Sequence, residues 1–291
     1  MALVQYSDSE SELEQEAPPR KINKLDQDTP SRSSPNTLPP LPAAFHDLYA
    51  SSIRVSVRDD PSLHGGRKRV IPHVEGNWPT HIYLEWYPSK DELEILRDII
   101  IRAEKILQGE ESKIHSLLHS DLGAQLPLHV SLSRPVVLRT EQRQPFLDTF
   151  QRTLQTSDIS PFDIQIGSLD WVSNSEKTRW FYVLRVKRPS QDHLNQLLRI
   201  SNVSLGIFGQ PPLYESTANP SELDTKKPKD YTEYFHVSVA WSLQEPSVRD
   251  RDKLESIALQ RLATLKIYFD SVKAKIGNHV SSIPLARSSS H

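Results

Sequence analysis

Two nearly identical tetrapeptides, His-Val-Ser-Leu at 129–132 and His-Val-Ser-Val at 236–239, are the residues of this chain best suited to chemistry. Each lies in a run that alternates polar and apolar side chains, which predicts a β-strand. Because strand side chains alternate between two faces, His129 projects beside Ser131, and His236 beside Ser238. Each strand therefore offers one imidazole and one hydroxyl side by side.

Two imidazoles and two hydroxyls in one site could break a phosphodiester. Imidazole titrates near pH ~6.5, so one His can take the proton of an attacking ribose 2′-hydroxyl while the other protonates the leaving 5′-oxygen. The attacking oxygen then closes a 2′,3′-cyclic phosphate. The hydroxyls of Ser131 and Ser238 can donate hydrogen bonds to the non-bridging oxygens, where negative charge must be held. This scheme requires no metal ion or cofactor, and we expect neither.

A plainer interpretation is that each His-x-Ser pair is the solvated face of a half-buried strand. For a chain with eleven histidines, chance predicts about 0.1 sequences of the form His-apolar-Ser-apolar. Two occur, both in strand-like surroundings. The repetition therefore favours a functional pair over two solvated surfaces.

Strands and helices are mixed along the chain around the two tetrapeptides. Further strands are predicted by alternating patterns at 80–86, 162–172, 180–187 and 267–276. Helices are predicted by a capping box at 89–92 with the apolar spacing that follows it, and by similar spacing at 146–154, 194–198 and 252–265. We therefore predict an α+β fold with two pseudo-symmetric lobes of antiparallel sheet plus helices, each giving one His-x-Ser strand to a central cleft.

The N-terminal segment differs in composition from the rest of the chain. Residues 1–44 are rich in Ser, Pro, Glu and Gln, and Tyr6 is the only aromatic residue among them. Such a segment cannot bury enough apolar surface to offset the entropy of ordering it. We predict a disordered tail over 1–44 and one two-lobed domain over 45–291.

Overall composition excludes several classes of protein. The formal net charge of −2 argues against a broadly basic surface that coats nucleic acid, although it allows a local basic groove. The chain has no cysteine, which excludes disulfides, thiolate zinc sites and cysteine nucleophiles. No apolar run approaches the length of a membrane span. We expect a soluble intracellular protein with no membrane partner, and a monomer.

Other histidines and aromatic residues have simpler interpretations. His115 and His119 could share a helix face as a metal pair, but no third ligand accompanies them, so we predict no metal site. His73 and His81 are assigned structural roles rather than catalysis. The tryptophans are assigned to the core rather than to base stacking, and they are Trp78, Trp86, Trp171, Trp180 and Trp241.

The paired His-x-Ser motifs resemble those of the two-histidine phosphodiesterase superfamily. Further motifs resemble the U6 small nuclear RNA phosphodiesterase family in particular, in order and over about residues 60 to 286. They are Gly65 to Arg69, Pro72-His73, Gly76-Asn77-Trp78, Thr80-His81, Leu128 to Arg134, Glu176 to Arg179, Phe235 to Trp241, Lys275 to Asn278 and Ile283-Pro284-Leu285.

The resemblance implies a nuclear 3′-to-5′ exoribonuclease that trims the uridine-rich 3′ end of U6 RNA. It leaves a 2′,3′-cyclic phosphate or a 3′-phosphate. It implies that His129 and His236 are the catalytic pair and that Ser131 and Ser238 hold the phosphate. We favour His236 as general base and His129 as general acid, an order that the sequence does not fix.

The family also stacks a terminal base on an aromatic residue just before the second motif. Tyr231 and Tyr234 are both near that position, and we favour Tyr231. Basic stretches at 67–69 and 226–229 are candidates for nuclear import, and the first also for contact with RNA phosphates. Two other functions stay open: a 2′,3′-cyclic nucleotide phosphodiesterase, and a protein that binds uridine-rich RNA ends without cleaving them.

Overall fold

The computed structural model describes residues 74–107, 113–174, 176–189, 191–215, 229–255 and 259–286. The predicted tail over 1–44 lies outside the described residues, as do His73 and the basic stretch at 67–69. No helix within the described ranges is long and apolar enough to cross a membrane.

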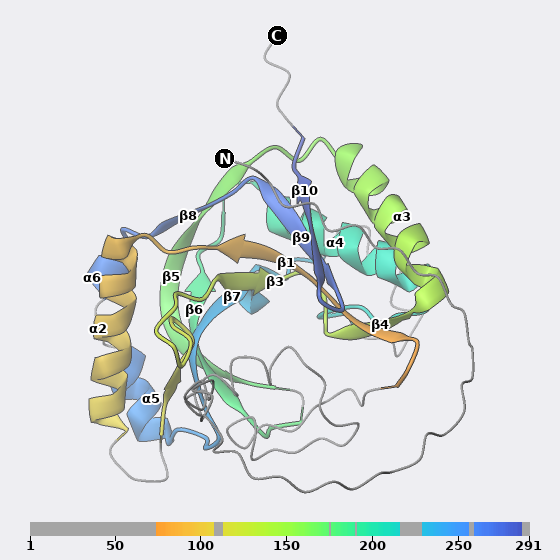
Figure 1. Cartoon of the computed structure of the whole chain (residues 1–291). Helices are drawn as coiled ribbons and strands as arrows, with labels where there is room; N and C mark the ends of the chain where they lie inside the picture. Colours follow the sequence, from red (N-terminus) through yellow and green to blue (C-terminus); the bar gives the residue numbers. More distant parts are fainter. Residues whose placement is uncertain are drawn as a thin grey trace, which may run out of the picture. The chain divides into compact units, whose positions relative to one another are not determined.

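One antiparallel sheet organises the described part of the chain (Figure 1). Its main path runs β10-β9-β1-β3-β7-β6-β5-β8, with β4 paired to β1 and β2 paired to β7. The strands are β1 (Asn77–Trp86), β2 (His115–Ser116), β3 (Leu128–Ser131), β4 (Val136–Arg139), β5 (Phe162–Ser173), β6 (Trp180–Val186), β7 (His236–Ser242), β8 (Lys266–Phe269), β9 (Ser271–Ile276) and β10 (His279–Pro284).

The two His-x-Ser strands, β3 and β7, are neighbours at the middle of this path. Strands β1, β9 and β10 continue the sheet beyond β3, and β6, β5 and β8 continue it beyond β7. The predicted α+β fold with two sheet lobes is therefore confirmed. The lobes are interleaved in sequence, because β8 pairs with β5 while the next strand, β9, pairs with β1.

The helices gather at two flanks of the sheet in Figure 1, with α2, α5 and α6 at one and α3 and α4 at the other. They are α2 (Lys90–Ile106), α3 (Arg143–Gln155), α4 (His193–Gly206), α5 (Val248–Glu255) and α6 (Leu259–Leu262), with short 3₁₀ turns η2 (Thr140–Gln142) and η4 (Thr232–Tyr234). The predicted capping box is confirmed. The Ser89 N–H donates to Glu92 Oε2 at 2.7 Å, and the Glu92 N–H donates to Ser89 Oγ at 3.4 Å.

The C-terminal part of the sequence-based assignment is wrong in its strands. Within the helix predicted over 252–265, the structure shows α5 and α6, and 256–258 lie outside the described residues. The single strand predicted over 267–276 is split at Asp270 into β8 and β9, and β10 was missed. The carbonyl of Asp270 accepts the Leu285 N–H at 2.8 Å and its carboxylate accepts the Ser271 hydroxyl at 2.9 Å. These bonds bend the chain into a second strand.

One face of the central strands is packed into the core and the other is open. On β1, Thr80, Ile82, Leu84 and Trp86 are buried and alternate with less buried side chains. Trp171 and Trp241 are also buried, which agrees with their assignment to the core. The open face of β1 carries His81, Tyr83 and Glu85. It is continuous with the face that carries both His-x-Ser pairs.

Candidate active site

The backbone pairing of β3 with β7 brings the two motifs together. Val130 pairs with Val237, and both side chains are fully buried. In an antiparallel pair this register sets His129 across from Ser238 and Ser131 across from His236, about 5 Å apart. The sequence therefore predicted the correct face, and the fold adds a local two-fold relation between the motifs.

The ring of His236 is held through its Nδ1 atom. Nδ1 lies 2.7 Å from the Tyr234 carbonyl oxygen. A carbonyl can only accept, so Nδ1 carries the proton and the neutral ring keeps its Nε2 lone pair. The hydroxyl of Tyr214 donates to the same carbonyl at 3.1 Å. The main chain before the motif thus fixes both the orientation and the tautomer of His236.

Arg185 braces the turn that carries this carbonyl. It pairs with His236 across β6 and β7. Its Nε and Nη2 atoms donate to Asp170 Oδ2 at 2.9 and 2.6 Å, and its Nη1 donates to the Glu233 carbonyl at 2.8 Å. The guanidinium therefore links Asp170 to the η4 turn and holds that turn in place. Sequence reasoning missed both Arg185 and Asp170, because their contact depends on the β5–β6 pairing.

His129 lies among other rings on the open face. Its ring centroid is 5.4 Å from that of His81 and 5.5 Å from that of Tyr83, both in edge-to-face geometry. His129 is exposed on this face, while the protein packed around its imidazole still lowers the hydration of the charged form. This burial and the neighbouring positive charge of His236 lower the pKa of His129 to about 4.

The two catalytic candidates differ in how they hold a proton. Burial also lowers the pKa of His236, but the Tyr234 carbonyl opposes this effect, and the Asp170 carboxylate offsets the lowering by Arg185. For His129 both causes act downward. These opposing causes favour His236 over His129 as the holder of a single shared proton.

His81 is a site residue that sequence reasoning assigned to a structural role. Its Nε2 lies 3.2 Å from Ser131 Oγ, and its ring stacks on Tyr83 at 5.1 Å with 24° between the planes. Burial, His129 and Lys275 lower its pKa to about 3. The alternation of 81, 83 and 85 against the buried 82, 84 and 86 was the signal that would have placed it on the open face.

Of the two tyrosines before the second motif, Tyr234 is the open one. Its side chain is 54% exposed, whereas Tyr231 is 6% exposed and packs in the core. The Tyr231 N–H donates to Asn195 Oδ1 at 2.8 Å, which ties it to α4. A base can reach only an exposed ring face, so this difference in exposure favours Tyr234 over Tyr231 as the stacking candidate.

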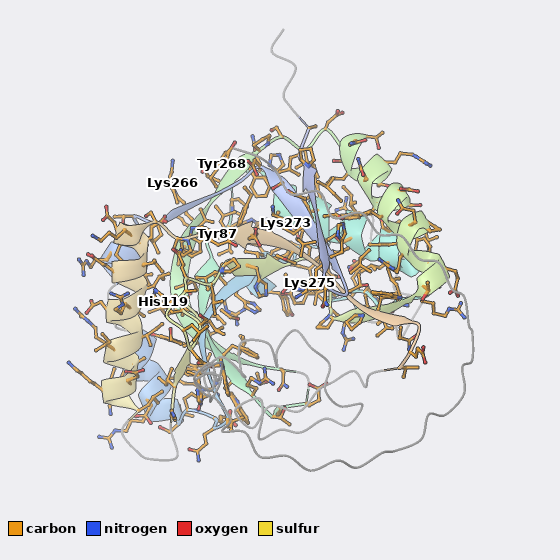
Figure 2. All side chains as sticks on the ribbon, in the orientation of Figure 1. Tyr87, His119, Lys266, Tyr268, Lys273 and Lys275 are labelled. Carbon is orange, nitrogen blue, oxygen red and sulfur yellow. The ribbon has the colours of Figure 1, made fainter. Side chains whose placement is uncertain are left out.

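Basic side chains extend the open face onto β9. Figure 2 shows Lys273 and Lys275 on this strand, and the register pairs Lys275 with His81 and Lys273 with Tyr83. The Nζ atom of Lys273 is 3.6 Å from Glu85 Oε2 and donates to Ser282 Oγ at 2.9 Å. The lysines therefore lie one strand beyond β1 as seen from Ser131, and Lys273 is paired with the Glu85 carboxylate.

The histidine pair considered for metal does not share a helix. His115 lies in β2 and stacks on Trp241 at 4.1 Å, while His119 makes an isolated bridge with Gln125. Over the described ranges, no group of three or more His, Asp or Glu residues could hold a metal ion.

Comparison with known proteins gives the family. A family model named HVSL and described as an uncharacterised conserved protein matches residues 39–284. U6 snRNA phosphodiesterase 1 of Neurospora crassa is 34% identical over 291 residues, covering 88% of this chain and 77% of that protein. The chain belongs to the U6 snRNA phosphodiesterase family. The Homo sapiens member is 28% identical, covering 97% of this chain and 98% of its own.

Solved structures agree with this fold. Usb1 of Kluyveromyces marxianus matches with a TM-score of 0.51 at 18% identity, covering 71% of this chain and 98% of that one. A structure of the same protein with uridine monophosphate matches with a TM-score of 0.50 at the same identity and coverage. At this identity the likeness to Usb1 shows the fold alone.

Proposed function

We propose that this chain is an RNA phosphodiesterase that trims the oligouridine 3′ end of U6 snRNA from 3′ to 5′. The observation that carries the proposal is the pairing of Val130 with Val237, which sets two His-x-Ser motifs on one open face. The names of its relatives support U6 snRNA as the substrate. The solved relative with bound uridine monophosphate supports the uridine preference.

The proposed reaction is a transesterification. The 2′-hydroxyl of the penultimate nucleotide loses its proton and attacks the phosphorus, and the bond to the 5′-oxygen of the terminal nucleotide breaks. A 2′,3′-cyclic phosphate closes on the shortened RNA, and the terminal nucleoside leaves. One proton leaves the 2′-hydroxyl and one is added to the departing 5′-oxygen. Two imidazoles can carry out both transfers without a metal ion.

The positions of the protons favour one order of roles. Neutral His129 takes the 2′-hydroxyl proton, and His236, which keeps the higher proton affinity, protonates the leaving oxygen. This order is the reverse of the one favoured from the sequence. It also puts the leaving nucleoside next to Tyr234, whose carbonyl holds the acid. The two roles would exchange if water later opened the cyclic phosphate to a 3′-phosphate.

The remaining groups bind the substrate in this proposal. Ser131 and Ser238 donate hydrogen bonds to the non-bridging oxygens, where preorganised donors stabilise developing charge. The exposed ring of Tyr234 stacks on the terminal base, a contact worth about 1–3 kcal/mol in single-strand binding. Stacking tolerates any base, so selectivity for uridine requires contacts to its edge as well.

The location and assembly of the protein follow from the substrate and the site. U6 snRNA is processed in the nucleus, so we place the protein there. Both histidines come from one chain, so a monomer suffices. The boundaries of the tail at 1–44 and the domain at 45–291 remain part of the proposal.

A single-atom change in the RNA tests the reaction. An oligouridine-ended RNA with a 2′-deoxy residue at the penultimate position lacks the attacking hydroxyl and should resist cleavage. The matched RNA with the deoxy sugar at the terminal position should be shortened like the all-ribose control. Equal cleavage of both would contradict transesterification.

Opening of cyclic nucleotides without shortening of the RNA would indicate the cyclic phosphodiesterase. A gel shift without cleavage would indicate an RNA-binding protein.

A further inference from the structure

A third histidine contacts the phosphate-binding machinery from the neighbouring strand. His81 lies on β1, whose register pairs Tyr83 with Ser131 and Glu85 with His129. The His81 side chain crosses to β3 diagonally, with its Nε2 3.2 Å from Ser131 Oγ. Its edge also meets the ring of His129. One imidazole therefore touches both functional side chains of the first motif.

We propose that His81 is a positioning residue that donates a hydrogen bond from Nε2 to Ser131 Oγ and so directs the serine proton to the scissile phosphate. The inference rests on the proposed function, since it gives Ser131 a phosphate to bind. Nothing in the reaction scheme requires a third imidazole. Its role is to act through Ser131 rather than on the substrate.

The direction of this hydrogen bond decides whether Ser131 can work. A hydroxyl has one proton and can accept two hydrogen bonds. If His81 accepted the serine proton, no proton would remain for the phosphate. If His81 donates, it occupies a lone pair of the serine and leaves the proton free. Only the tautomer with hydrogen on Nε2 is therefore compatible with catalysis.

The surroundings keep His81 neutral, as this role requires. Its ring lies between Tyr83 and His129, and Lys275 faces it across β9. Burial is the main cause that depresses its pKa far below the working range, and His129 and Lys275 act in the same direction. A neutral donor also adds no charge beside His129, whose own proton affinity is already low.

The second motif has different neighbours. Its Ser238 pairs with Val183 on β6, and the next paired residue along β6 in the diagonal direction is Tyr182 rather than a histidine. The two serines are thus set in different surroundings despite the local two-fold relation of the strands. We expect the dependence on His81 to appear through Ser131 and to be absent through Ser238.

Two substitutions separate hydrogen bonding from packing at His81. His81→Gln places an amide N–H near the position of Nε2 but loses the ring. His81→Phe keeps a ring stacked on Tyr83 but has no donor. The proposal predicts that the Gln variant retains cleavage within about 3-fold and that the Phe variant loses about 3- to 10-fold, the value of one hydrogen bond. The opposite ranking would show a packing role and overturn it.

A double-mutant cycle tests whether His81 acts through Ser131. Ser131→Ala should cost about 10²- to 10³-fold in kcat, as loss of one oxyanion donor does. Adding His81→Phe to Ser131→Ala should cost less than about 2-fold more, whereas adding it to Ser238→Ala should cost its full effect. An undiminished loss in the Ser131→Ala background would refute positioning through the serine.

The same preparations distinguish failure of this inference from failure of the proposed function. If the wild-type protein does not shorten oligouridine RNA, the proposed function fails. If it does and the cycle shows no coupling, only the role of His81 fails. Imidazole ¹⁵N shifts of the RNA-free protein give a readout apart from activity. They should show hydrogen on Nε2 of His81, and hydrogen on Nδ1 would contradict the proposal.

Discussion

The low pKa of His81 should make the folded protein less stable in acid. Its pKa is about 3 in the folded protein against 6.5 for an unperturbed histidine. The unfolded chain therefore binds a proton that the folded chain excludes. This contribution to the free energy of unfolding is fully present above pH 6.5 and is lost progressively as the pH falls toward 3. Unfolding of the wild-type protein should become easier over this range.

The size of this effect follows from the same two values. For one group that titrates at about 3 when folded and 6.5 when unfolded, the free energy of unfolding falls by about 2 kcal/mol between pH 7 and pH 5. His81→Phe removes the titration and keeps a ring on Tyr83. The variant should therefore lose about 2 kcal/mol less than the wild type over that interval.

Urea unfolding at pH 7 and pH 5 measures this difference. The wild type, His81→Phe and His279→Gln should be compared at one ionic strength; His279 lies on β10, away from β3, and its variant controls for the loss of a strand imidazole as such. The quantity of interest is the change in unfolding free energy within each protein, which cancels any constant packing cost. An equal pH dependence in the wild type and His81→Phe would refute the reasoning that His81 is held neutral by burial.

Three further predictions concern the catalytic groups. His236→Asn should raise the pKa of His129 above about 4 but leave it below 6.5, because burial is the larger cause; an NMR titration that places it at 6.5 would make charge the main cause. Tyr234→Ala should weaken binding of uridine monophosphate about 5- to 150-fold while Tyr234→Trp retains it, and unchanged calorimetric affinity for the Ala variant would exclude stacking there. Asp170→Asn should lower the pKa of His236, since it removes a carboxylate and releases Arg185, so the alkaline limb of the rate profile should move to lower pH; a shift to higher pH would contradict this.

Period-two alternation was enough to predict the essential part of the site. It put His129 with Ser131, and His236 with Ser238, on a face opposite buried Val130 and Val237. The same rule predicted the strand at 80–86 that carries His81. It did not give His81 a function, because a lone histidine in a strand is more often structural than functional.

Other features depend on pairing that no local pattern contains. Arg185 reaches Asp170 and the Glu233 carbonyl only because β5, β6 and β7 are adjacent. The split at Asp270 is set by its bond to Leu285, and periodicity on either side of the bend is too short to reveal it. Tyr231 and Tyr234 both lie just before the second motif, so the sequence does not distinguish them. In the fold, Tyr231 is bonded to Asn195 of α4 and is buried, whereas Tyr234 is exposed.

In the proposed reaction, two histidines on paired strands cleave RNA without a metal ion. The most direct test is a denaturing-gel time course on an end-labelled RNA with an oligouridine 3′ tail, in EDTA. The wild type should produce a ladder of single-nucleotide steps, while His129→Ala and His236→Ala, shown to be folded by thermal unfolding, should leave the RNA intact. A ladder of wild-type rate from either variant, or one that requires added metal ion, would contradict a metal-free reaction of two histidines.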